Sequence, residues 1–445
     1  MRRGLSRVLA TLLVGALAAG ACGSDDEATE GTSPPPTEAA ETTAIATEPT
    51  EEPVETTAET TADTEPQATT ADTEPPATEP PATSAEPTGP PIKLMAIFEA
   101  GGASATPEIA EGVQAAAAAI NRDGGVAGRP IEVIECDAGN DPNQAAECGR
   151  QAVAEGVVAV VSALSTNAGE YLPILAENQI PAVGNVPAAA ADFISEASFP
   201  IYGGLPSASA GLAAGLAAQG ATAVSVARVD LAAAAAIPAF AGAALATQGL
   251  AVVNDVAVPA GAPDMAAYVA SAMQGGTDGV VVGLFGQDAT NFIIQLRQTD
   301  PEVHIAATAT DFAAVIEAVG DAADGIVITE FFSLEGDAVD QFEADMQEAG
   351  YDEFSGFRRN AYASVLVVAE VAAGLADVTA AELWAALPAV EGLDIGLMPP
   401  LQFTTGGFGG IPRLFNVCTQ YAALDGGESV VFSDGFVNPF TGEAC

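Results

Sequence analysis

Four consecutive pieces of sequence decide the fold: IKLMAIF (92–98), EIAEGVQAAAAAINR (108–122), DGG (123–125) and PIEVIE (130–135). The first is a short apolar run, which is typical of a buried strand. The second is rich in alanine and predicts a helix, which the following glycine turn ends. The last predicts another strand. A strand, a helix and a second strand in this order predict a βαβ unit with parallel strands.

The same alternation continues along the chain. It predicts a helix over 142–155 and further strands over 157–162, 222–228, 279–283, 303–308 and 325–329. More than 350 residues of this pattern are too many for one sheet, so we expect an α/β protein with two doubly wound parallel-sheet lobes. Ligands of such folds bind beyond the carboxyl ends of the strands.

Charge and composition exclude several functions. The 445 residues include 60 acids and 12 basic residues, a net charge of −48. Too few cations are present to follow a phosphate backbone or to dock on anionic lipid. A single histidine argues against most catalytic triads and histidine-ligated metals. We therefore expect no enzyme, no cofactor, no metal and no nucleic-acid partner.

Residues 1–21 predict an export signal, with Arg2, Arg3 and Arg7 before the apolar run 8–19. The segment LAAGAC (17–22) resembles a bacterial lipobox. That resemblance implies cleavage before Cys22, lipidation of its thiol and an extracytoplasmic location anchored to the cell membrane. The alternative is a plain secretory signal with an incidental cysteine.

Residues 22–91 predict a disordered tether rich in threonine, glutamate and proline. Seventeen acids and no basic residue fall within 23–91, and TTADTEP occurs at 60–66 and again at 69–75. Almost no apolar bulk offsets the entropy of ordering such a segment. An O-glycosylated stalk is the alternative. The body, 92–445, keeps 43 acids and nine basic residues.

Four cysteines remain in the body: Cys136, Cys148, Cys418 and Cys445. An even number is compatible with an oxidising compartment. Cys136 ends a predicted strand and Cys148 lies in the next helix, so we favour this pair together with Cys418–Cys445. The other two connectivities and four free thiols remain open. No Cys-x-x-Cys spacing or nearby histidine supports zinc.

A family resemblance rests on an ordered series of motifs: GGVAGRP (124–130), DAGNDP (137–142), LST (164–166), IPAV (180–183), PAGAPDM (259–265), GTDGVVVG (276–283) and AYA (361–363). The series resembles the branched-chain amino-acid (leucine/isoleucine/valine-type) substrate-binding lipoproteins of ABC transporters, which have the type I periplasmic binding protein fold. The resemblance implies two lobes joined by a three-segment hinge. It places lobe 1 at 92–205 and 331–395, and lobe 2 at 206–330 and 396–445.

The resemblance also implies ligand-binding residues. Ser165 and Thr166 match hydroxyls that hold a ligand carboxylate, and free N–H groups at a helix N-terminus suit an anion. Asn167 with Glu170 predicts a capping box. The alternative is that the two hydroxyls only cap this helix.

Three other loops supply further candidates. Ala188 matches the next hydroxyl position, so only backbone contacts carry over there, and Asn185 is a substitute. In the second lobe Phe285 is a candidate for an apolar contact and Asp311 for pairing with an ammonium. The alternatives are a core role for Phe285 and a helix cap for Asp311. The aromatic residue expected after Asp230 is missing, so ligand identity stays open.

The sequence thus predicts a solute-binding lipoprotein that captures a small ligand, such as an amino acid or an amide, and delivers it to the permease of an ABC importer. The alternative is a ligand-sensing or structural envelope lipoprotein of the same fold. An enzyme is disfavoured because one histidine cannot complete a set of nucleophile, base and orienting group.

Overall fold

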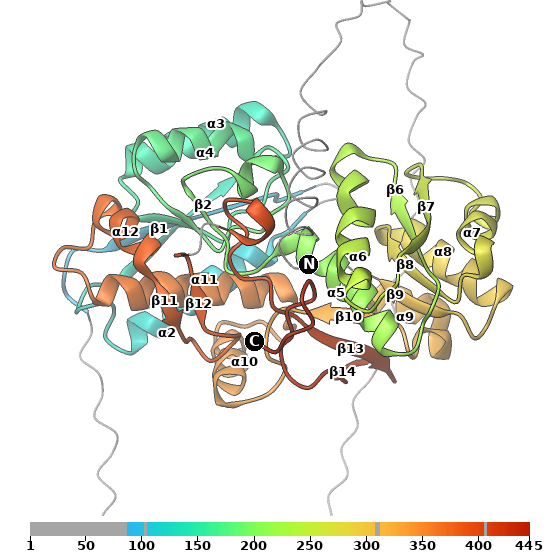
Figure 1. Ribbon diagram of the computed structural model, residues 1–445. Helices are drawn as coiled ribbons and strands as arrows, with labels where there is room; N and C mark the ends of the chain where they lie inside the picture. The colour runs from blue at the N-terminus through green and yellow to red at the C-terminus, as the bar shows by residue number, and fades with distance from the viewer. Residues whose placement is uncertain (1–86, 102–104, 308–311, 405–406) are drawn as a thin grey trace, which may run out of the picture. The chain divides into compact units, whose positions relative to one another are not determined.

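The computed structural model describes residues 87–101, 105–307, 312–404 and 407–445. Two sheets organise these residues, and we call each sheet with its helices a lobe (Figure 1). Lobe 1 has five strands in the order β2-β1-β3-β4-β5, all parallel. Its strands are β1 (Ile92–Phe98), β2 (Ile131–Asp137), β3 (Ala159–Val161), β4 (Ala182–Val183) and β5 (Ser198–Phe199). Its helices are α2 (Glu108–Arg122), α3 (Pro142–Glu155), α4 (Ala168–Glu177), α10 (Asp337–Glu348), α11 (Gly356–Ala373) and α12 (Ala380–Ala386).

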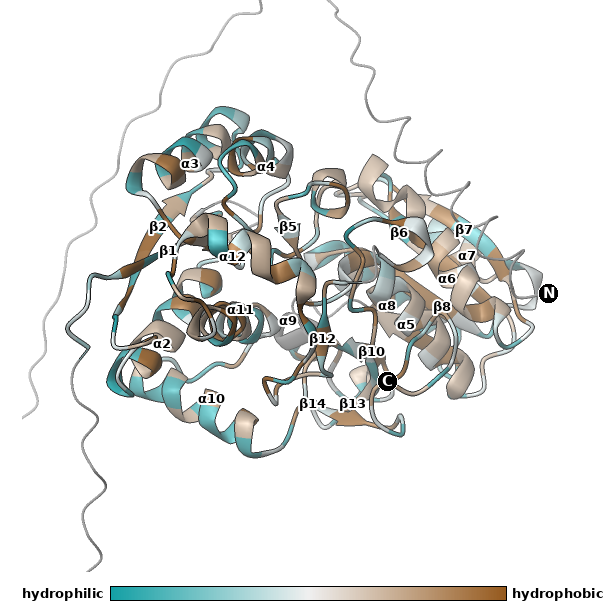
Figure 2. Ribbon diagram, turned by 60° about the vertical axis from the view of Figure 1, so that its left-hand side comes forward, coloured by the Kyte–Doolittle hydropathy of each residue, from teal (hydrophilic) through white to brown (hydrophobic). Residues whose placement is uncertain are grey.

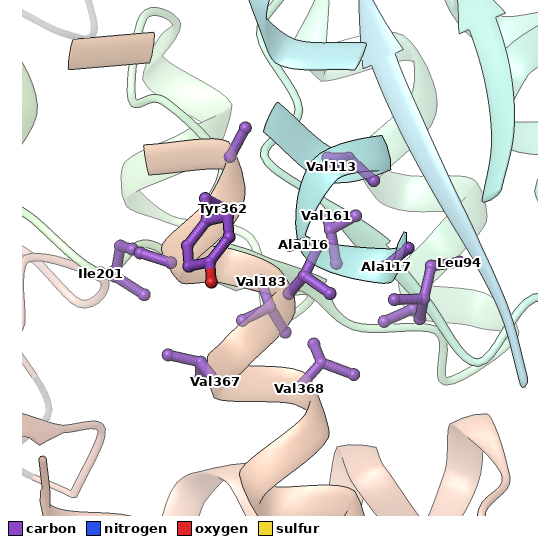
Figure 3. Packing of buried hydrophobic residues seen from close by; sticks show 14 of the residues in the cluster. Leu94, Val113, Ala116, Ala117, Val161, Val183, Ile201, Tyr362, Val367 and Val368 are labelled. Carbon is purple, nitrogen blue, oxygen red and sulfur yellow. The ribbon is translucent and has the colours of Figure 1, made fainter. Parts of the chain in front are cut away.

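Strand β1 is buried on both faces, which is why its sequence is apolar without alternation. Leu94 and Ala96 pack in a cluster with α2 and α11, whereas Met95 and Ile97 pack with α3 and α4. The two helix pairs therefore cover opposite faces of the sheet (Figure 1). Figure 3 shows the first cluster, where Tyr362, Val367 and Val368 of α11 meet Val113 of α2 and the strands.

Helix α10 lies outside this layer, against α2. It buries Val339, Phe342 and Met346 on one face together with Asp345, whose carboxylate is bonded to Arg122 and Tyr362, and exposes Asp337, Asp340 and Glu348 on the other; its colours alternate accordingly (Figure 2). This amphipathic pattern explains how the segment after residue 330 rejoins lobe 1.

Lobe 2 has seven strands in the order β14-β13-β10-β9-β8-β6-β7. Its strands are β6 (Val224–Val229), β7 (Val252–Val258), β8 (Gly279–Gly283), β9 (His304–Ala307), β10 (Val327–Glu330), β13 (Gln420–Asp425) and β14 (Glu428–Val431). Its helices are α5 (Gly204–Ala218), α6 (Ile237–Ala246), α7 (Ala266–Ala272), α8 (Gly286–Thr299) and α9 (Phe312–Val319). The first five strands in chain order are parallel, whereas β13 and β14 are antiparallel additions that the sequence did not predict.

The chain passes between the two sheets three times: after β5, after β10, and between β12 (Leu401–Gln402) and β13. Strand β12 pairs with β11 (Glu391–Leu393) outside both main sheets. The first two passages meet at Tyr202 and Phe331, whose ring centres lie 4.6 Å apart. Leu401, Phe403 and Phe415 belong to the hydrophobic cluster of lobe 1.

Helices α2 and α3 and strand β8 have the bounds that the sequence predicted. The predicted strands 157–162, 222–228, 303–308 and 325–329 are present but differ by one or two residues at each end. Both favoured disulfides are also present, with Cα–Cα distances of 5.7 Å for Cys136–Cys148 and 6.3 Å for Cys418–Cys445.

The predicted signal (1–21), Cys22 and nearly all of the tether lie outside the described residues. Within the described ranges, no helix is both long and apolar enough to cross a membrane.

Candidate functional site

The loops after β1, β3 and β4 meet at one edge of the parallel sheet in lobe 1. Leu164 N–H donates to Ile97 O over 3.0 Å, and Val186 N–H donates to Ala163 O over 2.8 Å. These bonds extend the pairing beyond the strands and fix the loops against one another. We call Glu99, Asn140, Ser162, Ser165, Thr166 and Asn360 the lobe-1 edge.

Ser165 is 2% exposed, and its hydroxyl group lies against a buried carboxylate. Its Oγ donates to Glu99 Oε1 over 2.8 Å and accepts the N–H of Asn167 over 3.1 Å. Glu99 is 3% exposed, and its other oxygen accepts the N–H of Asn140. The hydroxyl proton of Ser165 is therefore already engaged with Glu99.

Thr166 is exposed beside this pair. Its Oγ1 donates to Asn140 Oδ1 over 3.1 Å, which ties the loop after β3 to the loop after β2. The predicted capping box is wrong, because the Asn167 side chain makes no capping bond. Ser165 Oγ instead accepts the N–H of Asn167, the residue that precedes α4.

Asn360, on α11, joins the ends of two strands. Its Nδ2 donates to Ser162 Oγ and to Gly184 O, both over 2.8 Å. Ser162 has φ of 50°, a left-handed conformation that is uncommon outside glycine. Among the described residues, the buried Asn360 Oδ1 accepts no hydrogen bond.

Asn185 and Ala188 are brought together by Asp192. Asn185 is fully buried, and its Nδ2 donates to Asp192 Oδ1 over 2.8 Å. The N–H groups of Ala188 and Ala189 donate to Asp192 Oδ2 over 3.1 and 2.8 Å. The structure therefore uses the predicted ligand groups of this loop to fold the loop on itself.

Burial raises the pKa of Asp192 to about 7, although three hydrogen bonds to its carboxylate oppose the shift. Burial also raises the pKa of Tyr171 well above its usual 10, and the charges of Asp192 and Glu99 add to that shift. The same two causes, burial and the charge of Asp192, raise the pKa of Tyr202. Two buried carboxyl groups, Glu99 and Asp192, thus lie among the lobe-1 loops.

In lobe 2, β6 and β8 are parallel neighbours, and Arg228 lies opposite Gly283. Leu231 and Phe285 therefore follow adjacent strand ends. They are 56% and 48% exposed, so both apolar side chains are accessible to a ligand. The core role for Phe285 does not hold. Asp311 lies outside the described residues.

The described side chains offer binding chemistry and no metal centre. Within those ranges, no group of three histidine, cysteine, aspartate or glutamate residues could hold a metal ion. The lobe-1 edge instead offers oxygen acceptors, and Leu231 and Phe285 offer apolar surface in lobe 2; polar groups and apolar surface are the two kinds of contact that small-molecule sites use.

Sequence reasoning missed Glu99, Asn360 and Leu231. Glu99 directly follows the first strand, and Leu231 directly follows Asp230, where an aromatic residue was expected, so strand-end position could have identified both. Asn360 comes from a helix almost 200 residues after Ser162. No local pattern links these two residues.

Comparison with known proteins places the chain in a family. A family model described as "Periplasmic binding protein" matches residues 93–411. No curated relative matches the chain in sequence. The match agrees with the prediction that the chain is not an enzyme, because the family consists of binding proteins.

Solved structures share the fold at low identity. An extracellular ligand-binding receptor from Verminephrobacter eiseniae has 21% identity and a TM-score of 0.65, covering 76% of this chain and 99% of its own. A solute-binding protein from R. palustris, in complex with 4-hydroxybenzoate, has 18% identity and a TM-score of 0.64, covering 78% and 96%.

A branched-chain amino-acid transporter substrate-binding protein from Streptococcus pneumoniae, in complex with isoleucine, has 20% identity and a TM-score of 0.63, covering 77% and 99%. These likenesses show the same two-lobe α/β architecture. Together with the family match, which spans both lobes, they support one conclusion: the chain belongs to the periplasmic binding protein family.

Proposed function

We propose that this chain is an extracytoplasmic solute-binding lipoprotein that captures a small ligand between its lobes and delivers it to the permease of an ABC importer. The family match over residues 93–411 carries the proposal. Relatives in complex with isoleucine and with 4-hydroxybenzoate support a ligand of that size.

Within this proposal, the predicted site residues take two roles. Thr166 and Phe285, together with Leu231, contact the ligand, because all three side chains are exposed beyond strand ends. Ser165, Asn185 and Ala188 position the loops through their bonds to Glu99 and Asp192. Asp311 remains a candidate on sequence grounds alone.

Thermal shift with a panel of amino acids, their amides and aromatic acids tests the binding function. A ligand at 100 times its Kd stabilises the folded state by about 2.7 kcal/mol, which raises the Tm by several degrees. The binding affinity should fall about tenfold in Thr166→Val and in Phe285→Ser, with the Tm of the free protein unchanged. Val430→Ser is the matched control, because Val430 is 49% exposed in lobe 2 but lies on β14. A panel without any binder contradicts the proposal.

The lipid anchor and the importer need a separate experiment. Metabolic labelling with a fatty-acid analogue should label the wild-type chain and not Cys22→Ser, and the variant should leave the membrane fraction. Uptake of the identified ligand should fall in cells that lack the chain. If uptake stays normal while binding persists, the sensing lipoprotein becomes the better assignment.

A further inference from the structure

The two side-chain hydroxyls that were predicted to hold a ligand carboxylate, those of Ser165 and Thr166, already donate hydrogen bonds within the protein. A serine or threonine hydroxyl has one proton to donate and two lone pairs that accept. Ser165 directs its proton to Glu99 Oε1, and Thr166 directs its proton to Asn140 Oδ1. Neither hydroxyl has a proton left for a ligand carboxylate.

The lobe-1 edge has, in contrast, more hydrogen-bond acceptors than the protein's own donors occupy. Glu99 is a buried carboxyl group directly beside Ser165, and a second anion beside a carboxylate costs Coulomb energy. Thr166 Oγ1 is exposed and keeps its lone pairs. Among the described residues the buried Asn360 Oδ1 lacks a donor, and such an unpaired acceptor destabilises a fold unless a partner arrives.

Each cation of the body also makes at least one bond within the protein, which limits the positive charge that could neutralise an anionic ligand. The body has nine basic residues, all of them within the described ranges. Those that pair with carboxylates are Lys93, Arg122, Arg150, Arg228 and Arg358. Those that donate to backbone carbonyl oxygens are Arg129, Arg297, Arg359 and Arg413. Arg359 has a single such bond, and its buried Nε has no partner among the described residues. Its side chain is only 7% exposed, however, and its guanidinium carbon lies 5.4 Å from the centre of the Phe342 ring.

We infer that the ligand donates hydrogen bonds to the lobe-1 edge through an amide or ammonium group and carries no carboxylate, with its apolar part against Leu231 and Phe285. The inference rests on the proposed function and names the ligand class of that same site. Glu99 is then the specificity-determining residue, because its carboxylate accepts the hydrogen bond of the Ser165 hydroxyl and repels anions.

Two pairs of probes that differ only in this group test the inference on the full chain: isoleucine against isoleucinamide, and 4-hydroxybenzoate against 4-hydroxybenzamide. Isothermal titration should show that the amide binds at least tenfold more tightly than the acid in any pair that binds. In Glu99→Gln the side-chain amide can donate to Ser165 Oγ and free the hydroxyl proton, so the amide-to-acid ratio should fall about tenfold. Glu177→Gln, exposed at the far end of α4, is the matched control and should leave the ratio unchanged.

The possible outcomes separate the two proposals. Tighter binding of the acid by the wild-type chain overturns the ligand class and leaves the proposed function intact. A ratio that does not change in a folded Glu99→Gln variant overturns the role of Glu99. If no member of either pair and no member of the metabolite panel binds, the proposed function fails and this inference with it. The wild-type comparison alone decides the ligand class if Glu99→Gln does not fold.

Discussion

Two buried carboxyl groups, Glu99 and Asp192, do most to shape the loops of lobe 1. Each accepts hydrogen bonds from loop groups, and each is at most 3% exposed. Burying a carboxylate is costly unless it is bonded, so these contacts fix the loop conformation as well as stabilise it.

Asp192 gives the fold a defined pH dependence. Because its folded pKa of about 7 lies above the ordinary 3.8, the folded state holds a proton that the unfolded chain releases. This contribution to stability is fully present below about pH 4 and is lost as the pH rises through 7. In Asp192→Asn, the free energy of unfolding should fall less steeply over this range, by up to about 1.4 kcal/mol per pH unit.

Urea unfolding at several pH values between 4 and 8 measures this difference. Burial raises the pKa of Glu330 as well, so the comparison between wild type and variant isolates the share of Asp192. Asp340→Asn, at an exposed position on α10, should keep the wild-type slope. Equal slopes for the wild type and Asp192→Asn would show that Asp192 is ionised throughout.

Single residues also show how far the sequence can predict a site. Ser165 and Thr166 were identified because they follow a strand in a recognisable motif. The partner that sets the role of Ser165 is 66 residues earlier, and sequence spacing carries no information about that contact. The loop could therefore be predicted, but the direction of its hydroxyl protons could not.

At the scale of elements, the contact between α11 and the ends of β3 and β4 organises lobe 1. Gly184 has φ of 68°, and a Cβ atom there would overlap the Ser364 side chain on α11. The helix can approach the strand end this closely only because residue 184 has no side chain.

Gly184→Ala should therefore destabilise the protein by about 3 kcal/mol or more, from left-handed strain and from overlap together. Gly128→Ala is the matched control: its φ is 77°, but nothing lies within 4 Å of the added Cβ, so only the strain of about 1 to 2 kcal/mol remains. Denaturant unfolding of both variants measures the difference. Similar losses for the two would mean that α11 shifts to admit the methyl group.

Elements with strong local signals could be predicted with their bounds. Helix α3 begins after Asp141, whose side chain accepts two N–H groups, and ends at Gly156 with φ of 65°. Strands β13 and β14 lacked such signals, because their place depends on the antiparallel pairing of β13 with β10, about 90 residues earlier. Long-range pairing of this kind leaves little trace in local sequence.

At the scale of the whole molecule, the main feature is the excess of acidic over basic residues. The body carries 43 acids against nine basic residues, and all nine of these cations are already bonded within it. Most acids therefore have no cationic partner, and their mutual repulsion opposes the compact state.

Added sodium chloride should consequently stabilise the protein at neutral pH. The Debye length falls from about 30 Å at 0.01 M to about 3 Å at 1 M, which screens repulsion between exposed acids. The few ion pairs weaken as well, but exposed pairs contribute at most about 1 kcal/mol each. We expect the Tm at pH 7 to rise by several degrees between these two salt concentrations. Near pH 4.1, where the net charge is close to zero, the same scan should show little change. A fall in Tm at pH 7 would mean that the few ion pairs outweigh the repulsion among the unpaired acids.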